Sequence, residues 1–386
     1  MTKQEKVIIY HPSSFGGTYE HALFMFAEFE KQHGKGVAEI YFPVNAKAEG
    51  PYFHKVLLTD LPQGSKFLRR FHFLWRTFIN PLLFFFKTRK YKGAYILFNE
   101  FDQFSGWFWR WFFQAFRSGQ TYGIILHDPD RDAYAGNAQR SGWLMRQVML
   151  PMDVAFYHEV LPKRPYYENL PKTSFNNVML GLMPACEPDH SLLDELKQAC
   201  HGFKAMSILG NIREEKNYHI AITALKEYPN AKLIIGGRKA NSGVDVDAYR
   251  KLAESLGVAN QVIWLERFLT DAELSAIITI SDYSILNYSS TFKSQSGVIT
   301  LVASYRKPII ASDGESALAA VVKRFGLGLL AEPDNQENYN QALGNMIAGN
   351  YPQGEWDQFE AFASWETNIK TTMNAFKVAS EKNARA

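Results

Sequence analysis

The residues of this chain that could do chemistry lie where short apolar runs end. Gly16 and Gly17 follow the run KVIIYHP, and the run TYGIILHD ends in His127 and Asp128. Two adjacent glycines allow a sharp turn and let backbone N–H groups approach an anion at a helix start. A histidine beside a carboxylate can orient a hydroxyl group or move a proton. A plain strand-to-helix turn and a packed loop histidine are the alternative interpretations.

A second pair of charged residues follows the apolar run FKAMSILG. The loop GNIREEKNYH carries Arg213 and Lys216 at or just before the first turn of an expected helix. Two cations suit a diphosphate, because the charge on a departing diphosphate must be neutralised. Glu214 and Glu215 stand between them, so a solvated helix face is the alternative.

The stretch YSSTFKSQSGVITLVA (288–303) is rich in hydroxyl groups and ends in an apolar helix opened by Gly297. Thr291, Ser294 and Ser296 can donate hydrogen bonds, and a helix start adds unpaired N–H groups and the positive end of its dipole. We expect a phosphate cradle here. Ordinary serine capping of a buried helix is the alternative, but it explains one hydroxyl and not the cluster.

The elements that must position these loops follow an alternating pattern. Apolar runs ended by Gly, Pro, Asn or Asp alternate with longer amphipathic segments, which predicts parallel sheets with crossover helices. Strands are expected at 6–12, 37–43, 94–100, 121–128, 153–159, 203–210, 231–237, 261–266, 283–289 and 307–313. Helices are expected at 19–31, 106–117, 217–228, 244–256, 271–281, 297–305 and 356–378.

The length of 386 residues suits two domains of average size. The stretch LMPACEPDHS, with two prolines, falls between the two series and is interpreted as the linker. We therefore place one α/β domain at 1–185, a second at 186–355 and a closing helical segment at 356–386. Ligands of open parallel sheets bind beyond the carboxyl ends of the strands, so the active site is expected in a cleft between two Rossmann-like domains.

The composition indicates an ordinary globular protein, with 46% hydrophobic and 21% charged residues. Its two cysteines, Cys186 and Cys200, cannot form a disulfide framework, which favours a reducing compartment. The N-terminus lacks the pattern of a signal peptide, and no uncharged apolar run is long enough to span a bilayer. We expect a cytoplasmic protein.

Basic and aromatic residues are concentrated in one segment. The net charge is +3, yet Leu61–Asn99 has no Asp or Glu and carries eight Lys and Arg residues, and aromatic residues run from Phe67 to Phe116. Cations with interfacial aromatics suit an anionic membrane surface. Stacking on nucleic acid and packing in the core are the alternatives. We favour membrane contact through 61–118 and expect no nucleic-acid partner.

With these residues in view, the chain resembles glycosyltransferase family 4, which has the GT-B fold. GNIREEK is similar to the family's second-domain opening, in which a glycine is followed three to six residues on by a lysine. RKPIIASD (306–313) resembles its G-x-P-V-I-A-S-D strand, and FASWETNIKTTMNAF (362–376) resembles its closing helix, which returns to the first domain. The resemblance covers nearly the whole chain and is strongest over 203–332.

The resemblance implies roles for single residues. Lys216 would contact the donor diphosphate, His127 would lie near the transferred sugar, and Gly16 and Gly17 would approach the reaction centre through their backbone. Asn211 stands where the family has an arginine, with Arg213 close enough to substitute for it. The family also implies retention of anomeric configuration and no metal or other cofactor.

The nucleotide loop departs from the family pattern. Two glutamates, eight positions apart, usually precede the K-P strand, and here those positions hold Lys293 and Leu301. We interpret the loop Ser294–Gly297 as a divergent one that holds the diphosphate by hydroxyls, backbone N–H groups and Lys293.

The expected activity is sugar transfer from a nucleoside diphosphate sugar to an alcohol acceptor. The acceptor is expected to be a saccharide or lipid-linked saccharide in surface polysaccharide assembly, at the inner face of the plasma membrane. Two other functions remain open, a nucleotide-sugar 2-epimerase on the same fold and a degenerate protein that binds glycan or acts as a scaffold.

Overall fold

The computed structural model describes residues 5–59 and 65–385 and divides into two compact units. The first unit ends at Gly181 and takes up the chain again at Ala363, and the second runs from Leu182 to Phe362. The sequence analysis set its boundaries at 185 and 355 instead. Residues 61–64 of the expected membrane segment lie outside the described residues.

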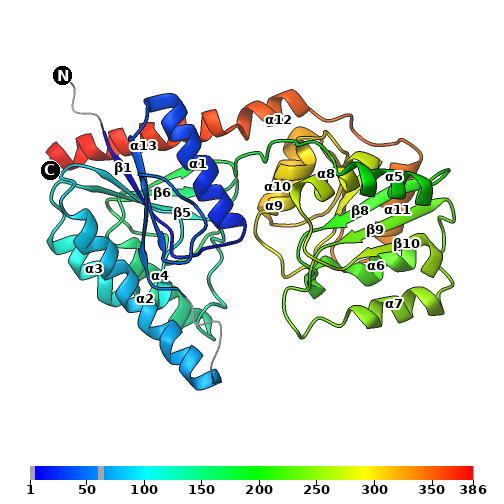
Figure 1. Cartoon of the computed structure of the whole chain (residues 1–386), viewed down its shortest axis with the longest axis horizontal. Coiled ribbons are helices and arrows are strands. Elements are labelled where there is room, and N and C mark those ends of the chain that lie inside the picture. Colours follow the sequence, from blue (N-terminus) through cyan, green and yellow to red (C-terminus); the bar gives the residue numbers. More distant parts are fainter. Residues whose placement is uncertain (1–4, 60–64, 386) are drawn as a thin grey trace. The chain divides into compact units, whose positions relative to one another are not determined.

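The first unit is built on a seven-stranded sheet of order β3-β2-β1-β4-β5-β6-β7, in which every described pairing is parallel (Figure 1). All five strands expected in this half are present. The short strands at the two edges, β3 and β7, were not expected, because their polar and half-buried residues do not form an apolar run. The strands are β1 (Val7–Tyr10), β2 (Ala38–Pro43), β3 (Phe53–Leu57), β4 (Tyr95–Phe98), β5 (Thr121–Leu126), β6 (Val154–Tyr157) and β7 (Ser174–Asn177).

Helices cover both faces of this sheet (Figure 1). On one face Val7 and Ile9 pack with α1 and α13, and on the other Ile8 and Tyr10 pack with α2, α3 and α4. Burial on both faces explains why these strands read as continuous apolar runs. The helices are α1 (Gly17–His33), α2 (Lys66–Thr88), α3 (Gly106–Ala115), α4 (Ala138–Met149) and α13 (Trp365–Arg385).

Helix α2 was not expected from the sequence, because Pro81 interrupts its pattern. Proline has no N–H, so the carbonyl of Thr77, four residues earlier, loses its helical partner. The hydroxyl of Ser105, just before α3, donates to that carbonyl instead. The helix therefore continues through the proline because a neighbouring element replaces the missing hydrogen bond.

The second unit has a six-stranded parallel sheet of order β10-β9-β8-β11-β12-β13. Helices α6 and α7 lie on one side of it and α8, α9 and α10 on the other (Figure 1). The strands are β8 (Lys204–Leu209), β9 (Ala231–Gly236), β10 (Val262–Leu265), β11 (Tyr283–Leu286), β12 (Ile309–Ser312) and β13 (Gly328–Ala331). The helices are α5 (His190–Ala199), α6 (Tyr218–Ala224), α7 (Val246–Ser255), α8 (Asp271–Ile280), α9 (Gly297–Ala303), α10 (Ala317–Phe325), α11 (Gln336–Ile347) and α12 (Trp356–Phe362).

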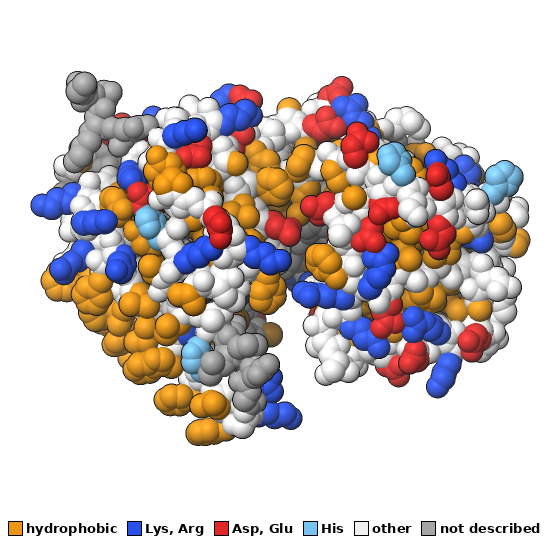
Figure 2. All heavy atoms as spheres, viewed as in Figure 1, with side chains coloured by type: hydrophobic (Ala, Val, Ile, Leu, Met, Phe, Trp, Pro, Cys, Tyr) orange, Lys and Arg blue, Asp and Glu red, His pale blue; other side chains and the backbone are white. Residues whose placement is uncertain are grey.

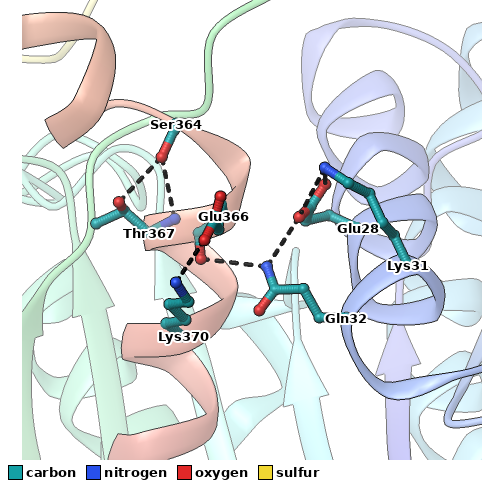
Figure 3. A network of polar contacts seen from close by, with 7 residues as sticks. All are labelled: Glu28, Lys31, Gln32, Ser364, Glu366, Thr367 and Lys370. Carbon is teal, nitrogen blue, oxygen red and sulfur yellow. Dashed lines mark hydrogen bonds and ion pairs between the residues drawn. The ribbon is translucent and has the colours of Figure 1, made fainter.

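The single closing helix expected over 356–378 is two helices, α12 and α13, which belong to different units. Ser364 accepts from the N–H of Thr367 at 3.1 Å and so caps the start of α13. Gln32 of α1 donates to the carbonyl of Glu366 at 3.2 Å and to Glu28 at 2.9 Å (Figure 3). The indole of Trp365 lies against Gly181, where a Cβ would meet it at 2.2 Å. These contacts fix α13 to the first unit.

In the described part of the chain, none of the helices combines the length and the apolar character needed to cross a bilayer. Cys186 and Cys200 are both free thiols.

Candidate active site

Each sheet has one point where the order of its strands reverses. The chain builds β1, β2 and β3 toward one edge and then places β4 on the other side of β1, and it does the same with β8 and β11. Ligands of open α/β sheets bind beyond the carboxyl ends of the strands at such a point. The residues that follow these strands form a candidate site in each unit.

In the first unit, a histidine cluster surrounds Asn99, which directly follows β4. The Nδ2 of Asn99 donates to His11 Nδ1 at 3.0 Å and to the carbonyl of Thr18 at 2.9 Å. Its Oδ1 lies 2.9 Å from Nδ1 of His21 in α1. The amide of one buried side chain therefore joins the ends of β1 and β4 to the first helix.

His127, which follows β5, completes this cluster. Its Nδ1 lies 3.0 Å from Nε2 of His158, and its Nε2 lies 3.4 Å from Oδ1 of Asn99. His158 follows β6 and bonds through Nδ1 to the carbonyl of Val178 at 2.7 Å. Only His127 of these histidines is partly exposed; the others are buried. No three His, Cys, Asp or Glu side chains converge as metal ligands in the described ranges.

Burial keeps the cluster uncharged at neutral pH. It lowers the pKa of His11 and of His158 to about 4, and that of His21 to about 3. Burial also lowers the pKa of His127 well below its usual value, and the neighbouring histidines lower it further. Neutral imidazoles offer one donor and one acceptor each, so the cluster presents hydrogen-bonding groups and not cations.

These pKa values predict an acid-sensitive fold. Because the native values lie below the ordinary value of 6.5, the unfolded chain binds more protons between pH 6.5 and about 4. Stability is therefore expected to fall as pH falls through this window, by about 1.4 kcal/mol per pKa unit for each histidine. Thermal melting between pH 7 and 4.5 measures the slope. In the His21→Asn variant residue 21 cannot titrate between pH 7 and 4.5, so the melting temperature should fall less steeply with pH than in wild type. An unchanged slope contradicts the lowered pKa assigned to His21.

A loop with two glycines lies beside the cluster. The carboxylate of Glu100 accepts from Thr18 Oγ1 at 2.9 Å and from Ser13 Oγ, and lies 4.0 Å from His11 Nε2. Gly16 has φ +95°, a conformation that suits glycine, and no side chain caps the start of α1 at Gly17. Both glycines are exposed, with nothing within 4 Å of an added Cβ. The backbone there is open to a ligand, and Asp128 is exposed at the end of β5.

In the second unit the structure brings together the two loops that the sequence analysis selected. The N–H of Ser289, after β11, donates to the carbonyl of Glu215 at 2.7 Å. The carboxylate of Asp334, after β13, accepts from Asn217 Nδ2 at 3.0 Å and from the N–H of Ser290 at 2.9 Å. No local sequence pattern selects Asp334, because its role depends on the order of the strands.

Lys216 is the last residue of a short 3-10 helix, η2 (Glu214–Lys216), and its side chain is only 6% exposed. Its Nζ donates to the carbonyl of Leu209 at the end of β8. Burial, with the nearby charge of Arg213, lowers the pKa of Lys216 to about 7. A buried ammonium is costly without an anion, so this position favours a negatively charged ligand. Arg213 and Asn211 are exposed on the same loop.

In the hydroxyl-rich loop within 288–297, one of the serines expected to bind phosphate is buried. Ser296 is 4% exposed, and its hydroxyl lies 2.8 Å from that of Tyr288, whose ring stacks on Phe292 at 4.0 Å. This hydroxyl is therefore engaged within the fold, and its contact with a phosphate stays a prediction. Lys293 and Gly297 are exposed, and Ser294 is half-buried.

Comparison with known proteins places the second site in a family. Residues 200–358 match the family model "Glycosyl transferases group 1". The matched residues lie within the second unit, Leu182–Phe362. The match includes both loops of the second site, and the sequence-based resemblance is confirmed there. No curated protein matches the chain.

Solved structures match over both units. Sucrose-phosphate synthase from Thermosynechococcus elongatus has 12% identity over 99% of this chain and 100% of its own, with a TM-score of 0.71. Anabaena Alr3699/HepE in complex with UDP-glucose has 16% identity over 99% and 100%, with a TM-score of 0.66. An α,α-trehalose-phosphate synthase (UDP-forming) from Burkholderia vietnamiensis has 10% identity over 98% and 99%, with a TM-score of 0.71. The chain has the GT-B fold that the sequence analysis expected.

Proposed function

We propose that the chain transfers a sugar from a nucleoside diphosphate sugar to an alcohol acceptor. The observation that carries the proposal is the buried Lys216, which lies where the strand order of the second unit reverses, within the residues that match the family model. In this reaction the bond between the anomeric carbon and the diphosphate oxygen breaks, a bond from that carbon to the acceptor oxygen forms, and the hydroxyl hydrogen of the acceptor is released as a proton. Lys216 supplies positive charge where the diphosphate gains negative charge.

The other site residues take complementary roles in this proposal. Arg213, Asn211, Lys293 and the backbone at Gly297 hold the diphosphate from the exposed side of the second site. These groups supply the positive charge and hydrogen bonds that a metal ion would otherwise provide, so the reaction is proposed to need no metal. Retention of anomeric configuration belongs to the same proposal and rests on the family resemblance.

The first unit is proposed to handle the sugar and the acceptor. His127 and Glu100 present hydrogen-bonding groups at the ends of β5 and β4, and Gly16 and Gly17 leave the backbone open beside them. Hydroxyl groups of a saccharide match such acceptors and N–H donors. The Alr3699/HepE complex with UDP-glucose and the UDP-forming trehalose-phosphate synthase support a UDP-sugar as the donor.

Thermal melting with nucleotides tests the donor proposal. UDP is expected to raise the melting temperature, because a ligand that binds only the folded state stabilises it by about 2.7 kcal/mol at 100 times its Kd. Uridine, which lacks the diphosphate, should give little or no shift, and GDP and ADP test the choice of base. Stabilisation by none of the three diphosphates would favour a scaffold role. Nucleoside diphosphate release from a panel of donors then tests turnover.

The proposal for the acceptor rests on the surface of α2 and α3. Large apolar side chains stand exposed there, with Phe67 at 79%, and Figure 2 shows apolar side chains gathered over this part of the first unit. They are Phe67, Leu68, Phe71, Phe73, Leu74, Trp75, Phe86, Trp107, Trp111 and Phe116. Exposed cations accompany them, namely Lys66, Arg69, Arg70, Lys87, Arg89, Lys90 and Lys92. We call these side chains together the aromatic–basic surface.

An anionic membrane is the partner proposed for this surface. Contiguous apolar area of this kind marks an interaction site, and interfacial aromatics with Lys and Arg suit lipid headgroups. A cavity of about 560 Å³ opens on the surface between Phe86 and Phe116, with Arg89 and Lys90 in its lining. It offers apolar walls to an acyl chain and cations to a headgroup. The acceptor is accordingly proposed to be a lipid-linked saccharide at the inner face of the plasma membrane, in surface polysaccharide assembly.

The structure also separates this surface from the core. Arg76 is only 9% exposed, and Phe84, Phe85, Trp109 and Phe113 are buried. Part of the aromatic segment is therefore core, as the alternative interpretation held. Arg76 is not available to a membrane, which removes it from the set of cations expected to bind lipid.

A further inference from the structure

We propose that His158 holds His127 in the tautomer that keeps a free lone pair on Nε2, so that His127 accepts a hydrogen bond from a ligand hydroxyl. The inference rests on the proposed function in naming a saccharide hydroxyl as that ligand. His158 is thereby a positioning residue, and the structure fixes its role through one chain of hydrogen bonds.

This series of hydrogen bonds begins at a backbone carbonyl. His158 Nδ1 lies 2.7 Å from the carbonyl oxygen of Val178, which can only accept, so Nδ1 must carry the hydrogen. His158 is 2% exposed and neutral, and a neutral imidazole has a single N–H. Nε2 of His158 therefore has a lone pair and can only accept.

The next hydrogen bond transfers this constraint to His127. Its Nδ1 lies 3.0 Å from Nε2 of His158, and since that nitrogen accepts, Nδ1 of His127 must donate. His127 is neutral as well, which leaves a lone pair on Nε2. The tautomer follows from the hydrogen-bond partners and not from an observed hydrogen position.

The amide of Asn99 does not satisfy this lone pair. Its Nδ2 is the atom that bonds to the Thr18 carbonyl at 2.9 Å, and this fixes which end of the amide is oxygen. The atom that faces His127 Nε2 at 3.4 Å is therefore Oδ1, another acceptor. Two lone pairs facing each other have no hydrogen between them.

A hydroxyl group from a ligand can supply the hydrogen that the two facing lone pairs lack. His127 is the partly exposed member of the histidine cluster, and a hydroxyl next to it can donate its hydrogen to Nε2. The buried pair of His158 and Val178 keeps the ring from turning or changing tautomer. Partners of this kind outside the direct contact typically change activity by about 10–100-fold when they are removed, as measured at metal sites.

Two substitutions at His158 separate its role in positioning His127 from its role in filling space in the fold. Glutamine can place a carbonyl oxygen near the position of Nε2 and still accept from His127, whereas phenylalanine fills the space without an acceptor. We expect His158→Gln to keep kcat within about threefold of wild type, and His158→Phe to lower kcat by about 10–100-fold. The Kd for UDP, which binds the second unit in this account, should stay unchanged in both.

The tautomer itself is measured by NMR of protein labelled with ¹⁵N-histidine, with His127→Gln identifying the signal. Wild type and His158→Gln are expected to show His127 protonated at Nδ1, and His158→Phe to show a mixture or protonation at Nε2. Protonation at Nε2 in wild type overturns the inference, and so does an equal loss of kcat in both variants. The spectrum needs no substrate, so it can support the tautomer even if no nucleotide sugar is turned over, a result that would count against the proposed function alone.

Discussion

Replacing Lys216 with methionine is expected to lower kcat/KM for the nucleotide-sugar donor by about 10²–10³-fold, the effect typical of a lost charge-stabilising donor. The side chain is buried, its ammonium bonds to the carbonyl of Leu209, and its pKa is lowered to about 7. Such a cation gains more from a diphosphate than an exposed lysine would, because little water competes for it. Lys216→Ala should act in the same direction, with an added cavity.

The melting temperature of Lys216→Met shows whether its loss of activity comes from the missing charge or from misfolding. A lysine whose native pKa lies below the ordinary value of 10.5 is destabilising when charged, and its stability contribution improves as pH rises from about 7 to 10.5. Lys216→Met should therefore melt at or above the wild-type temperature at pH 7. The matched control is Lys226→Met, an exposed lysine of the same unit, which should leave turnover unchanged. Unchanged turnover in Lys216→Met would remove this residue from the diphosphate site.

Reversing Arg69, Arg70, Arg89 and Lys90 to glutamate is expected to weaken binding to anionic vesicles by at least about 10³-fold. Each cation near an anionic surface contributes about 1 kcal/mol, and the four introduced glutamates would also be repelled. All four side chains are exposed on the aromatic–basic surface. Flotation with phosphatidylserine vesicles measures the change, and phosphatidylcholine vesicles show how much binding needs lipid charge.

The control for this variant has the same change in net charge, made outside the aromatic–basic surface. Exposed lysines outside the surface provide it, namely Lys163, Lys226, Lys251 and Lys323. Their reversal should cost far less vesicle binding, because none of them belongs to the aromatic–basic surface. Arg76 is left unchanged, since reversing a buried residue would test folding. Persistent binding of the first variant, or equal loss in the control, would contradict the membrane proposal.

The sequence predicts much of the fold because both sheets are buried on two faces. Stretches such as 94–98 and 233–236 are apolar throughout, and this signal marks central parallel strands. Edge strands such as β7 are short and polar, so they carry no such signal. Helix α2 was missed because its continuation past Pro81 depends on Ser105, a partner from another element.

The candidate site can be predicted only in part from the sequence, because its side chains also depend on partners from other elements. Loops at strand ends can be found from the apolar runs, and this selected His127 and Lys216. The partners of His127 are far from it in the chain, and only the pairing of β4 and β6 with β5 brings Asn99 and His158 to it. Asn99 is the next-to-last residue of the strand predicted at 94–100, and that position was the one signal that could have selected it. The burial of Ser296 depends on Tyr288, which no local pattern indicates.

A structure of the protein crystallised with UDP tests the central claim most directly. We predict that the diphosphate lies within hydrogen-bonding distance of Lys216 Nζ and near the backbone N–H groups at Gly297, at the ends of β8 and β11. A diphosphate bound at another part of the protein, with Lys216 still bonded to the carbonyl of Leu209 and Phe292 still stacked on Tyr288, would contradict the account.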